Sequence, residues 1–197
     1  MSKHLRLLFV ALAALATVAF STSVAQASRG VSINRTSIGA GGRLTLNDGD
    51  TVCDVLLTLT TAASIAKVID TRVGGVTGGT ITNCNNLATS GQVLATAAAP
   101  IPVLFSSWDG VLPTGITEIN VYANPAGFLL NTIIGSCLYG GRLIGIRFNV
   151  SGGNVTGATF NTNNLPGAAG NSIFCPASGN IRGTLTVLGT PPIITLV

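Results

Sequence analysis

Apolar and polar side chains alternate along residues 51–61, which read Thr-Val-Cys-Asp-Val-Leu-Leu-Thr-Leu-Thr-Thr. One face of this segment, if extended, carries Cys53, Val55, Leu57 and Leu59, whereas the other face is mostly polar. A period of two places successive side chains on opposite sides of a strand. The segment is therefore predicted to be a half-buried β-strand that ties its own cysteine into a core.

Short segments of the same kind recur along the rest of the chain. The expected strands are 31–34, 43–47, 80–84, 93–97, 103–108, 116–122, 142–150, 155–161, 181–188 and 193–197. Within 142–150, one face is expected to carry Ile144, Ile146, Phe148 and Val150. The stretch 61–73 is ambiguous, since part of it fits one or two helical turns.

Clusters of Gly, Asn, Asp and Pro separate these segments and are typical of turns. About ten to twelve short strands without a long helix predict an all-β fold. We expect a single β-sandwich, jelly-roll-like or Ig-like, and because no linker or internal repeat divides the chain, residues 28–197 are assigned to one domain.

The first 27 residues have the pattern of a secretory signal peptide. Basic residues precede an apolar run from Leu7 to Phe20, and Ala25-Gln26-Ala27 fits a cleavage site. The run is shorter than the about 20 residues of a membrane span, so an uncleaved anchor is the less favoured alternative. We expect a secreted protein, extracellular or at the cell surface, with no integral membrane segment after cleavage.

Charge is sparse, because only 8% of all residues are charged. After removal of residues 1–27, eight basic residues stand against six acidic ones, and the basic residues are scattered singly. A nucleic-acid-binding surface requires a basic patch or stripe. The sequence therefore predicts no nucleic-acid partner, and its polar surface is expected to consist of Thr, Ser, Asn and Gly.

Four cysteines remain after the signal peptide, and an even number in an exported chain indicates two disulfides. Three pairings are possible for four cysteines. Sequential pairing joins neighbouring strands, so the favoured bonds are Cys53–Cys84 and Cys137–Cys175.

Catalytic chemistry has few candidate residues here. The single histidine, His4, belongs to the expected signal peptide. Residues 28–197 therefore contain no histidine for a nucleophile–histidine pair or for a histidine-based metal site. Glu118 is the only glutamate, and no phosphate-binding or Gly-x-Ser-x-Gly motif occurs. We expect a protein that is not an enzyme, without catalytic, metal-binding or cofactor-binding residues.

Calcium ligation by Asn47, Asp48, Asp50 and Asp54 is less favoured than a polar hairpin turn.

Aromatic residues offer the candidate ligand contacts. Trp108 with Asp109 could form a platform for a sugar, as could Tyr122 and Tyr139. A single aromatic residue at a strand end more often belongs to the core or its rim. Trp108 and Asp109 are kept as candidate ligand contacts.

The chain ends with a cysteine, a Gly-Thr-Leu-Thr strand, a proline pair and an apolar terminus. The residues read Phe174-Cys175-Pro176-Ala177-Ser178-Gly179, Gly183-Thr184-Leu185-Thr186 and Pro191-Pro192-Ile193-Ile194-Thr195-Leu196-Val197. This pattern resembles the PraB-type secreted activators of alkane oxidation, and related small exported bacterial proteins of unknown role. The resemblance departs at Ser106-Ser107-Trp108, where Leu-Pro-Trp is expected. It implies an extracellular β-protein linked to alkane use, the cell surface or biofilm, and no catalytic residues.

Two functions are expected. The first is a structural or adhesive factor of the cell surface or extracellular matrix, with self-association or a cell-surface polymer as its partner. The second is an extracellular binding module for a glycan or an apolar small molecule. The uncharged segment 193–197 has high β-propensity and is expected either to fill its own sheet or to join that of a neighbour. A flat, unpaired apolar edge favours the first function, and a pocket lined by Trp108 and other apolar side chains favours the second.

Overall fold

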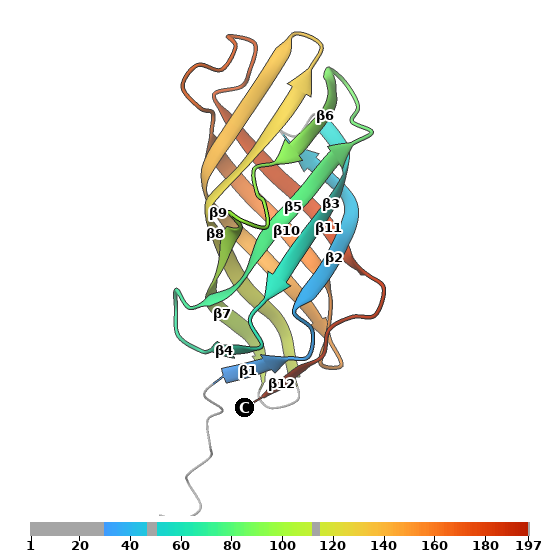
Figure 1. The fold of residues 1–197 in the computed structure, drawn as a ribbon, viewed down its shortest axis with the longest axis vertical. Coiled ribbons are helices and arrows are strands. Elements are labelled where there is room, and N and C mark those ends of the chain that lie inside the picture. The colour runs from blue at the N-terminus through green and yellow to red at the C-terminus, as the bar shows by residue number, and fades with distance from the viewer. Residues whose placement is uncertain (1–29, 47–50, 112–114, 197) are drawn as a thin grey trace, which may run out of the picture.

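The computed structural model describes residues 30–46, 51–111 and 115–196, and every regular element in these ranges is a β-strand (Figure 1). The expected signal peptide at 1–27 and the expected turn at 47–50 lie outside the described residues. No helix in the described ranges is long and apolar enough to cross a membrane. The ambiguous stretch 61–73 contains the short strand β4 (Ser64–Ala66) and no helix. The all-β prediction is confirmed for these ranges.

The main sheet closes into a barrel with eight strand positions. Its strands are β2 (Ser37–Leu46), β3 (Thr51–Thr61), β5 (Arg72–Thr82), β6 (Ala88–Val93), β7 (Ile101–Val111), β8 (Gly115–Thr132), β9 (Gly135–Ser151), β10 (Asn154–Pro166) and β11 (Ser178–Leu188). Neighbouring strands are antiparallel. β6 and β7 share one position, because both pair with β5 on one side and β8 on the other. β2 pairs with both β3 and β11, and this closes the ring.

This closure differs from the expected sandwich of two facing sheets. Alternating strands bury one apolar face in either architecture, so the sequence pattern fits both. The ring of pairings decides between them, because each strand position pairs with a neighbour on both sides, β3 with β5 and β2 with β11 included. The pairing of β2 with β11 joins segments more than a hundred residues apart, such as Leu46 opposite Ile181. One curved sheet therefore encloses the core, and its two halves are continuous.

A small sheet lies across the lower end of the barrel in Figure 1. It consists of β1 (Gly30–Ile33) flanked by β4 and by β12 (Ile194–Leu196), all antiparallel. Three of its side chains, Val31, Ile33 and Ile65, are buried in the same core as the barrel interior. The final strand thus fills a sheet of its own chain, which is one of the two roles expected for segment 193–197.

Gly145 changes which side chains of β9 face the interior. Its φ is +75°, and a Cβ atom there would lie 2.4 Å from the carbonyl oxygen of Asn161. The alternation is therefore displaced by one residue at this point: Leu143 is 7% exposed and Ile144 is 54% exposed. The face predicted for 142–150 is wrong at Ile144, which points outward, while Ile146 and Val150 are buried as expected.

Both favoured disulfides are present in the structure. Cys53–Cys84 joins β3 to the end of β5, and Cys137–Cys175 joins β9 to the loop before β11. No free cysteine remains among the described residues. Two disulfides are consistent with an extracellular protein, because such bonds persist in oxidising compartments.

Candidate functional site

Trp108 and Asp109 lie near the lower end of the barrel, on β7. Trp108 is half-buried against the core, 5.8 Å from Phe105 between ring centroids, and the Lys67 ammonium lies 4.1 Å from the centroid of its indole ring. Asp109 is exposed and accepts a hydrogen bond of 2.9 Å from the Asn120 amide. Neither residue lines the cavities or the cleft described below. A ligand contact at these two residues stays a prediction.

The two tyrosines expected as alternative aromatic contacts lie in different environments. Tyr139 is fully buried and stacks on Phe128, with 5.1 Å between ring centroids. Tyr122 is buried beneath polar groups: its hydroxyl donates to the Asp70 carboxylate, and the Arg142 guanidinium lies 4.2 Å from its ring centroid. These contacts join the loop before β5 to strands β8 and β9, so they stabilise the barrel wall.

Because Tyr122 donates a hydrogen bond to Asp70, we expect the protein to lose stability at alkaline pH. The hydrogen bond to Asp70 raises the pKa of Tyr122, and burial and the Asp70 charge add to this, whereas Arg142 opposes it. Because the pKa is higher in the folded state, the stabilisation is complete below the ordinary value of 10.0 and is lost as the pH rises through the folded-state pKa. We expect Tyr122→Phe to cost less stability at about pH 11 than at about pH 8, measured by urea unfolding. An identical cost at both pH values would contradict this coupling.

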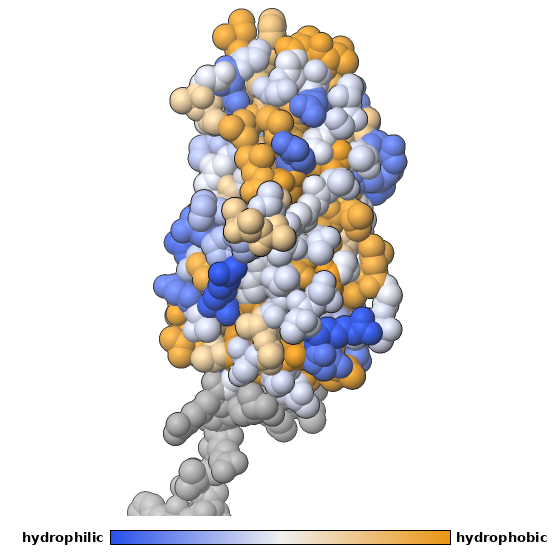
Figure 2. Space-filling model, viewed as in Figure 1, coloured by the Kyte–Doolittle hydropathy of each residue, from blue (hydrophilic) through white to orange (hydrophobic). Residues whose placement is uncertain are grey.

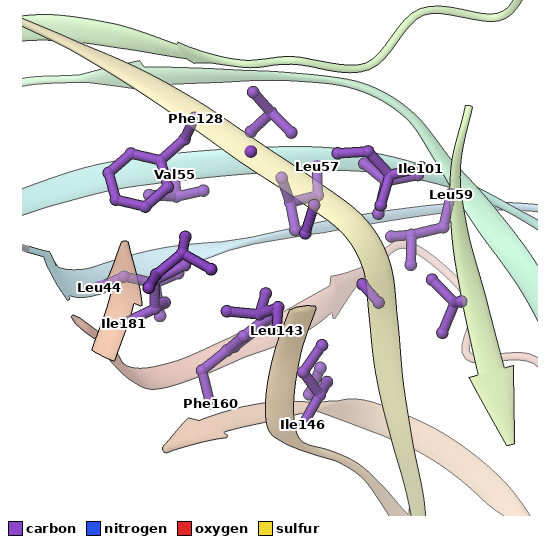
Figure 3. A pocket seen from close by; sticks show the side chains of 18 of the residues that line it. Leu44, Val55, Leu57, Leu59, Ile101, Phe128, Leu143, Ile146, Phe160 and Ile181 are labelled. Carbon is purple, nitrogen blue, oxygen red and sulfur yellow. The ribbon is translucent and has the colours of Figure 1, made fainter. Parts of the chain in front are cut away.

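The barrel interior holds a cavity of about 90 Å³ whose lining is entirely apolar (Figure 3). Figure 3 shows side chains from opposite walls, among them Leu57, Phe128, Leu143 and Phe160, pointing into a common space with no oxygen or nitrogen among the sticks. Close-packed interiors have few voids larger than a water molecule. The core is therefore filled incompletely along the barrel axis.

A second cavity, of about 50 Å³, lies toward the small sheet. Its lining includes Ile33 and Ile65 from that sheet and Ile119 from the lower part of β8. Leu59, Phe148 and Ala158 line both cavities. The two spaces are thus neighbours, and these three side chains stand between them.

A larger cleft of about 530 Å³ lies on the surface near the Cys137–Cys175 disulfide. It is bordered by β6, by the turn between β8 and β9, and by the loop 167–177. Its described lining residues are Thr51, Asn86, Leu87, Ala88, Leu130, Thr132, Ile134, Cys137, Ser172, Phe174, Cys175 and Pro176. None of these residues is charged.

Large apolar side chains are exposed around this cleft, at the top end of the molecule in Figures 1 and 2. We call Leu87, Ile133, Ile134, Ile173 and Phe174 the upper apolar cluster. Their exposed fractions are 52%, 70%, 44%, 92% and 65%. The Ile133 amide donates to the Leu87 carbonyl at 3.0 Å, and Ile134, Leu87 and Phe174 line the cleft together. The cluster is therefore built from three segments that border one cleft.

The loop that carries Ile173 and Phe174 is fixed to β9. The Asn171 side chain accepts a hydrogen bond from the Leu138 amide and donates one to the Leu138 carbonyl, both at 2.9 Å. The Ala168 amide donates to the same carbonyl at 2.8 Å. Together with the Cys137–Cys175 bond, these contacts hold the two apolar side chains outward on an ordered backbone.

One feature of the sequence indicates the upper apolar cluster. Ile133-Ile134 occupies the turn between β8 and β9, and Ile173-Phe174 lies in a loop rich in Asn, Pro and Gly. Turns and loops are normally polar because they run over the surface. Two consecutive large apolar residues in each of two loops are therefore a sign of an exposed apolar surface.

The acidic side chains have different hydrogen-bond and ion-pair partners, although Asp109 lies opposite Glu118 in the pairing of β7 with β8. Asp54 lies 3.4 Å from Arg43 and accepts a 2.9 Å hydrogen bond from Asn83, and Glu118 lies 3.6 Å from Arg147. Within the described residues, no three of His, Cys, Asp and Glu come together in a group that could hold a metal ion. Asp48 and Asp50 of the less favoured calcium site lie outside those residues.

Comparison with known proteins identifies no relative: no family model, no curated protein and no solved structure matches this chain.

Proposed function

We propose that this is a secreted, non-catalytic protein that adheres to apolar material at the cell surface or in the extracellular matrix. The observation that carries the proposal is the upper apolar cluster, five large side chains 44–92% exposed around an uncharged cleft. Contiguous exposed apolar patches in soluble proteins mark interaction sites. The resemblance to PraB-type proteins supports an apolar partner, since it links the chain to alkane use.

The segments that carry the cluster are free of charged residues over long stretches. The segments 83–96, 128–141 and 166–181 contain no Asp, Glu, Lys or Arg. Burial of a charge against an apolar phase is costly unless the charge is paired. These three segments therefore contact hydrocarbon without that cost, whereas Arg35, Lys67, Asp109, Glu118 and other charged residues lie on other segments. Asp50, which precedes Thr51 of the cleft, lies outside the described residues.

Adsorption to hexadecane droplets tests this function. We expect the double variant Ile133→Ser with Phe174→Ser to adsorb at least about tenfold more weakly than the wild type, because burial of one large apolar side chain contributes about 1.5–3 kcal/mol. The matched control is Ile69→Ser with Ile144→Ser, which removes side chains 66% and 54% exposed elsewhere on the molecule. Equal adsorption of the two double variants would contradict a role for the upper end.

A second function, the binding of an apolar small molecule, is favoured by the barrel interior. The cavity of about 90 Å³ has an apolar lining and lies inside an ordered scaffold. Ligand pockets are concave and mostly apolar, although most are larger than this one. This function uses a different part of the molecule from adhesion, so the two are tested separately.

A further inference from the structure

The two interior cavities are divided by side chains from opposite walls of the barrel. β3 and β9 are four positions apart in either direction around the eight-position ring, through β2, β11 and β10 or through β5, β7 and β8. Leu59 on β3 and Phe148 on β9 line both cavities. They therefore reach toward the barrel axis from opposite sides and form a partition across it.

Ala158 belongs to the same partition and makes it thin. Ala158 on β10 is paired with Phe148 in the strand register, so their side chains lie next to each other on the inner face. A small residue at this position leaves space beside the phenyl ring. The cavities are thus separated by two large side chains and one methyl group.

Water is a poor occupant of this space. A buried water molecule typically makes about three hydrogen bonds to polar groups. The larger cavity is lined by aliphatic and phenyl side chains and glycine, and among the lining side chains of the smaller one only Thr61 has a polar atom. The Thr61 hydroxyl already donates to the Arg35 carbonyl. An apolar molecule matches the lining better than water does.

We propose that the barrel interior binds an unbranched aliphatic chain along its axis, and that Leu59 and Phe148 set the length of the chain. This inference rests on the second function proposed above and gives it a ligand class. An enclosed apolar cavity of about 150 Å³ takes a six-carbon ring. The larger cavity, at about 90 Å³, accordingly suits about four carbon atoms. Joining it with the neighbouring space of about 50 Å³ makes room for about six.

The ligand class follows from the shape of the space. The two cavities lie in line between the walls of a narrow barrel, and the ring of strands restricts the width but not the length. A branched or cyclic molecule wider than this space would need the walls to move apart, which breaks strand pairing. A linear chain needs only a change of side-chain rotamer at Phe148 or Leu59.

The test is a titration of the full mature chain with xenon and with n-butane, n-pentane, n-hexane and n-octane, followed by methyl NMR. The wild type is expected to bind xenon and n-butane saturably, with shifts at Val55, Leu57 and Ile146, and to bind n-octane at least about tenfold more weakly. Phe148→Leu is expected to move the preference to n-hexane or longer. The absence of saturable binding in the wild type would overturn the proposal, as would an unchanged length preference in Phe148→Leu.

Filling variants locate the binding. Ala158→Leu occupies the partition space and is expected to reduce xenon and n-butane affinity at least about tenfold. Ala126→Val fills only the larger cavity and serves if Ala158→Leu does not fold. Undiminished binding in a folded filling variant would show that the site is elsewhere and overturn the proposal. Phe174→Ser at the upper end should bind n-butane as the wild type does, which separates this result from the outcome of the adsorption test.

Discussion

Replacing both Cys137 and Cys175 by alanine is expected to lower the free energy of unfolding by about 4 kcal/mol. The bond closes a loop with a sequence separation of 38 residues, and its loss returns the entropy of that loop to the unfolded chain. The same change removes the covalent attachment of the loop that carries Ile173 and Phe174 and leaves its hydrogen bonds to Leu138. Urea unfolding under oxidising conditions measures the first effect, and hexadecane adsorption measures the second.

The matched control is replacement of Cys53 and Cys84 by alanine. That bond spans 31 residues, so its contribution to stability is also about 4 kcal/mol, but it does not hold the loop 167–177. We expect both pairs of substitutions to destabilise the barrel. In protein that is still folded, loss of Cys137–Cys175 should weaken adsorption more than loss of Cys53–Cys84, because the first bond holds the loop of Ile173 and Phe174 and the second lies near Leu87 alone. Equal adsorption losses for the two pairs would show that the effect comes from general destabilisation and not from the upper loop.

Tyr139→Ala is expected to cost about 3–5 kcal/mol, the range for deletion of a large buried aromatic side chain. Tyr139 is 0% exposed, is the largest of the fully buried side chains, and stacks on Phe128. Packing around it is tight, since a Cβ atom added at Gly179 would lie 3.0 Å from the tyrosine ring. The surrounding strands cannot collapse onto the space without breaking their pairing, so the cavity would persist and the cost should lie in the upper part of this range.

The control for Tyr139→Ala is Ile144→Ala, on the same strand. Ile144 is 54% exposed, so its truncation should change the free energy of unfolding by no more than about 0.5 kcal/mol. Tyr139→Phe keeps the ring and its stacking and should cost much less than Tyr139→Ala. If Tyr139→Ala and Ile144→Ala had similar unfolding midpoints, the assignment of Tyr139 to the core would be wrong.

Strands were predictable where alternation is strict, because alternation is a local property, whereas the expected strand 93–97 was wrong beyond residue 93, where β6 ends. Segment 51–61 has the same bounds in the structure as in the sequence pattern, and its buried residues include Cys53, Val55 and Leu57. Sequential disulfide pairing was predictable for a similar reason, since it links elements that are near each other along the chain. Both features depend on residues within a few tens of positions.

Closure of the sheet was not predictable from these patterns. It depends on the pairing of β2 with β11, and the sequence of neither strand specifies the strand with which it pairs. The inversion at Gly145 was also hidden, because alternation continues on both sides of the glycine and only its positive φ reveals the displacement. One glycine therefore reversed the face assigned to Ile144 while leaving Ile146 and Val150 correct.

The candidate sites were less predictable than the fold. A prediction from residue type favours aromatic and charged side chains such as Trp108 and Asp109, whose chemistry is recognisable in isolation. The upper apolar cluster consists of common aliphatic residues and one phenylalanine, and its meaning comes from exposure, which depends on the neighbouring segments. The interior cavities depend on how side chains from distant strands pack together, and the sequence pattern does not show that packing.

The pairing of β1 with β12 has a consequence for the connectivity of the chain. Val31 lies opposite Leu196, so the first and last described strands are neighbours at one pole, and the upper apolar cluster lies at the other (Figure 1). A short linker could join these strands, and new termini could be opened in the exposed loop between β6 and β7. Such a circular permutant would retain every strand pair of the barrel. A protein fused to its new termini would be attached at the side wall of the barrel instead of at the lower pole.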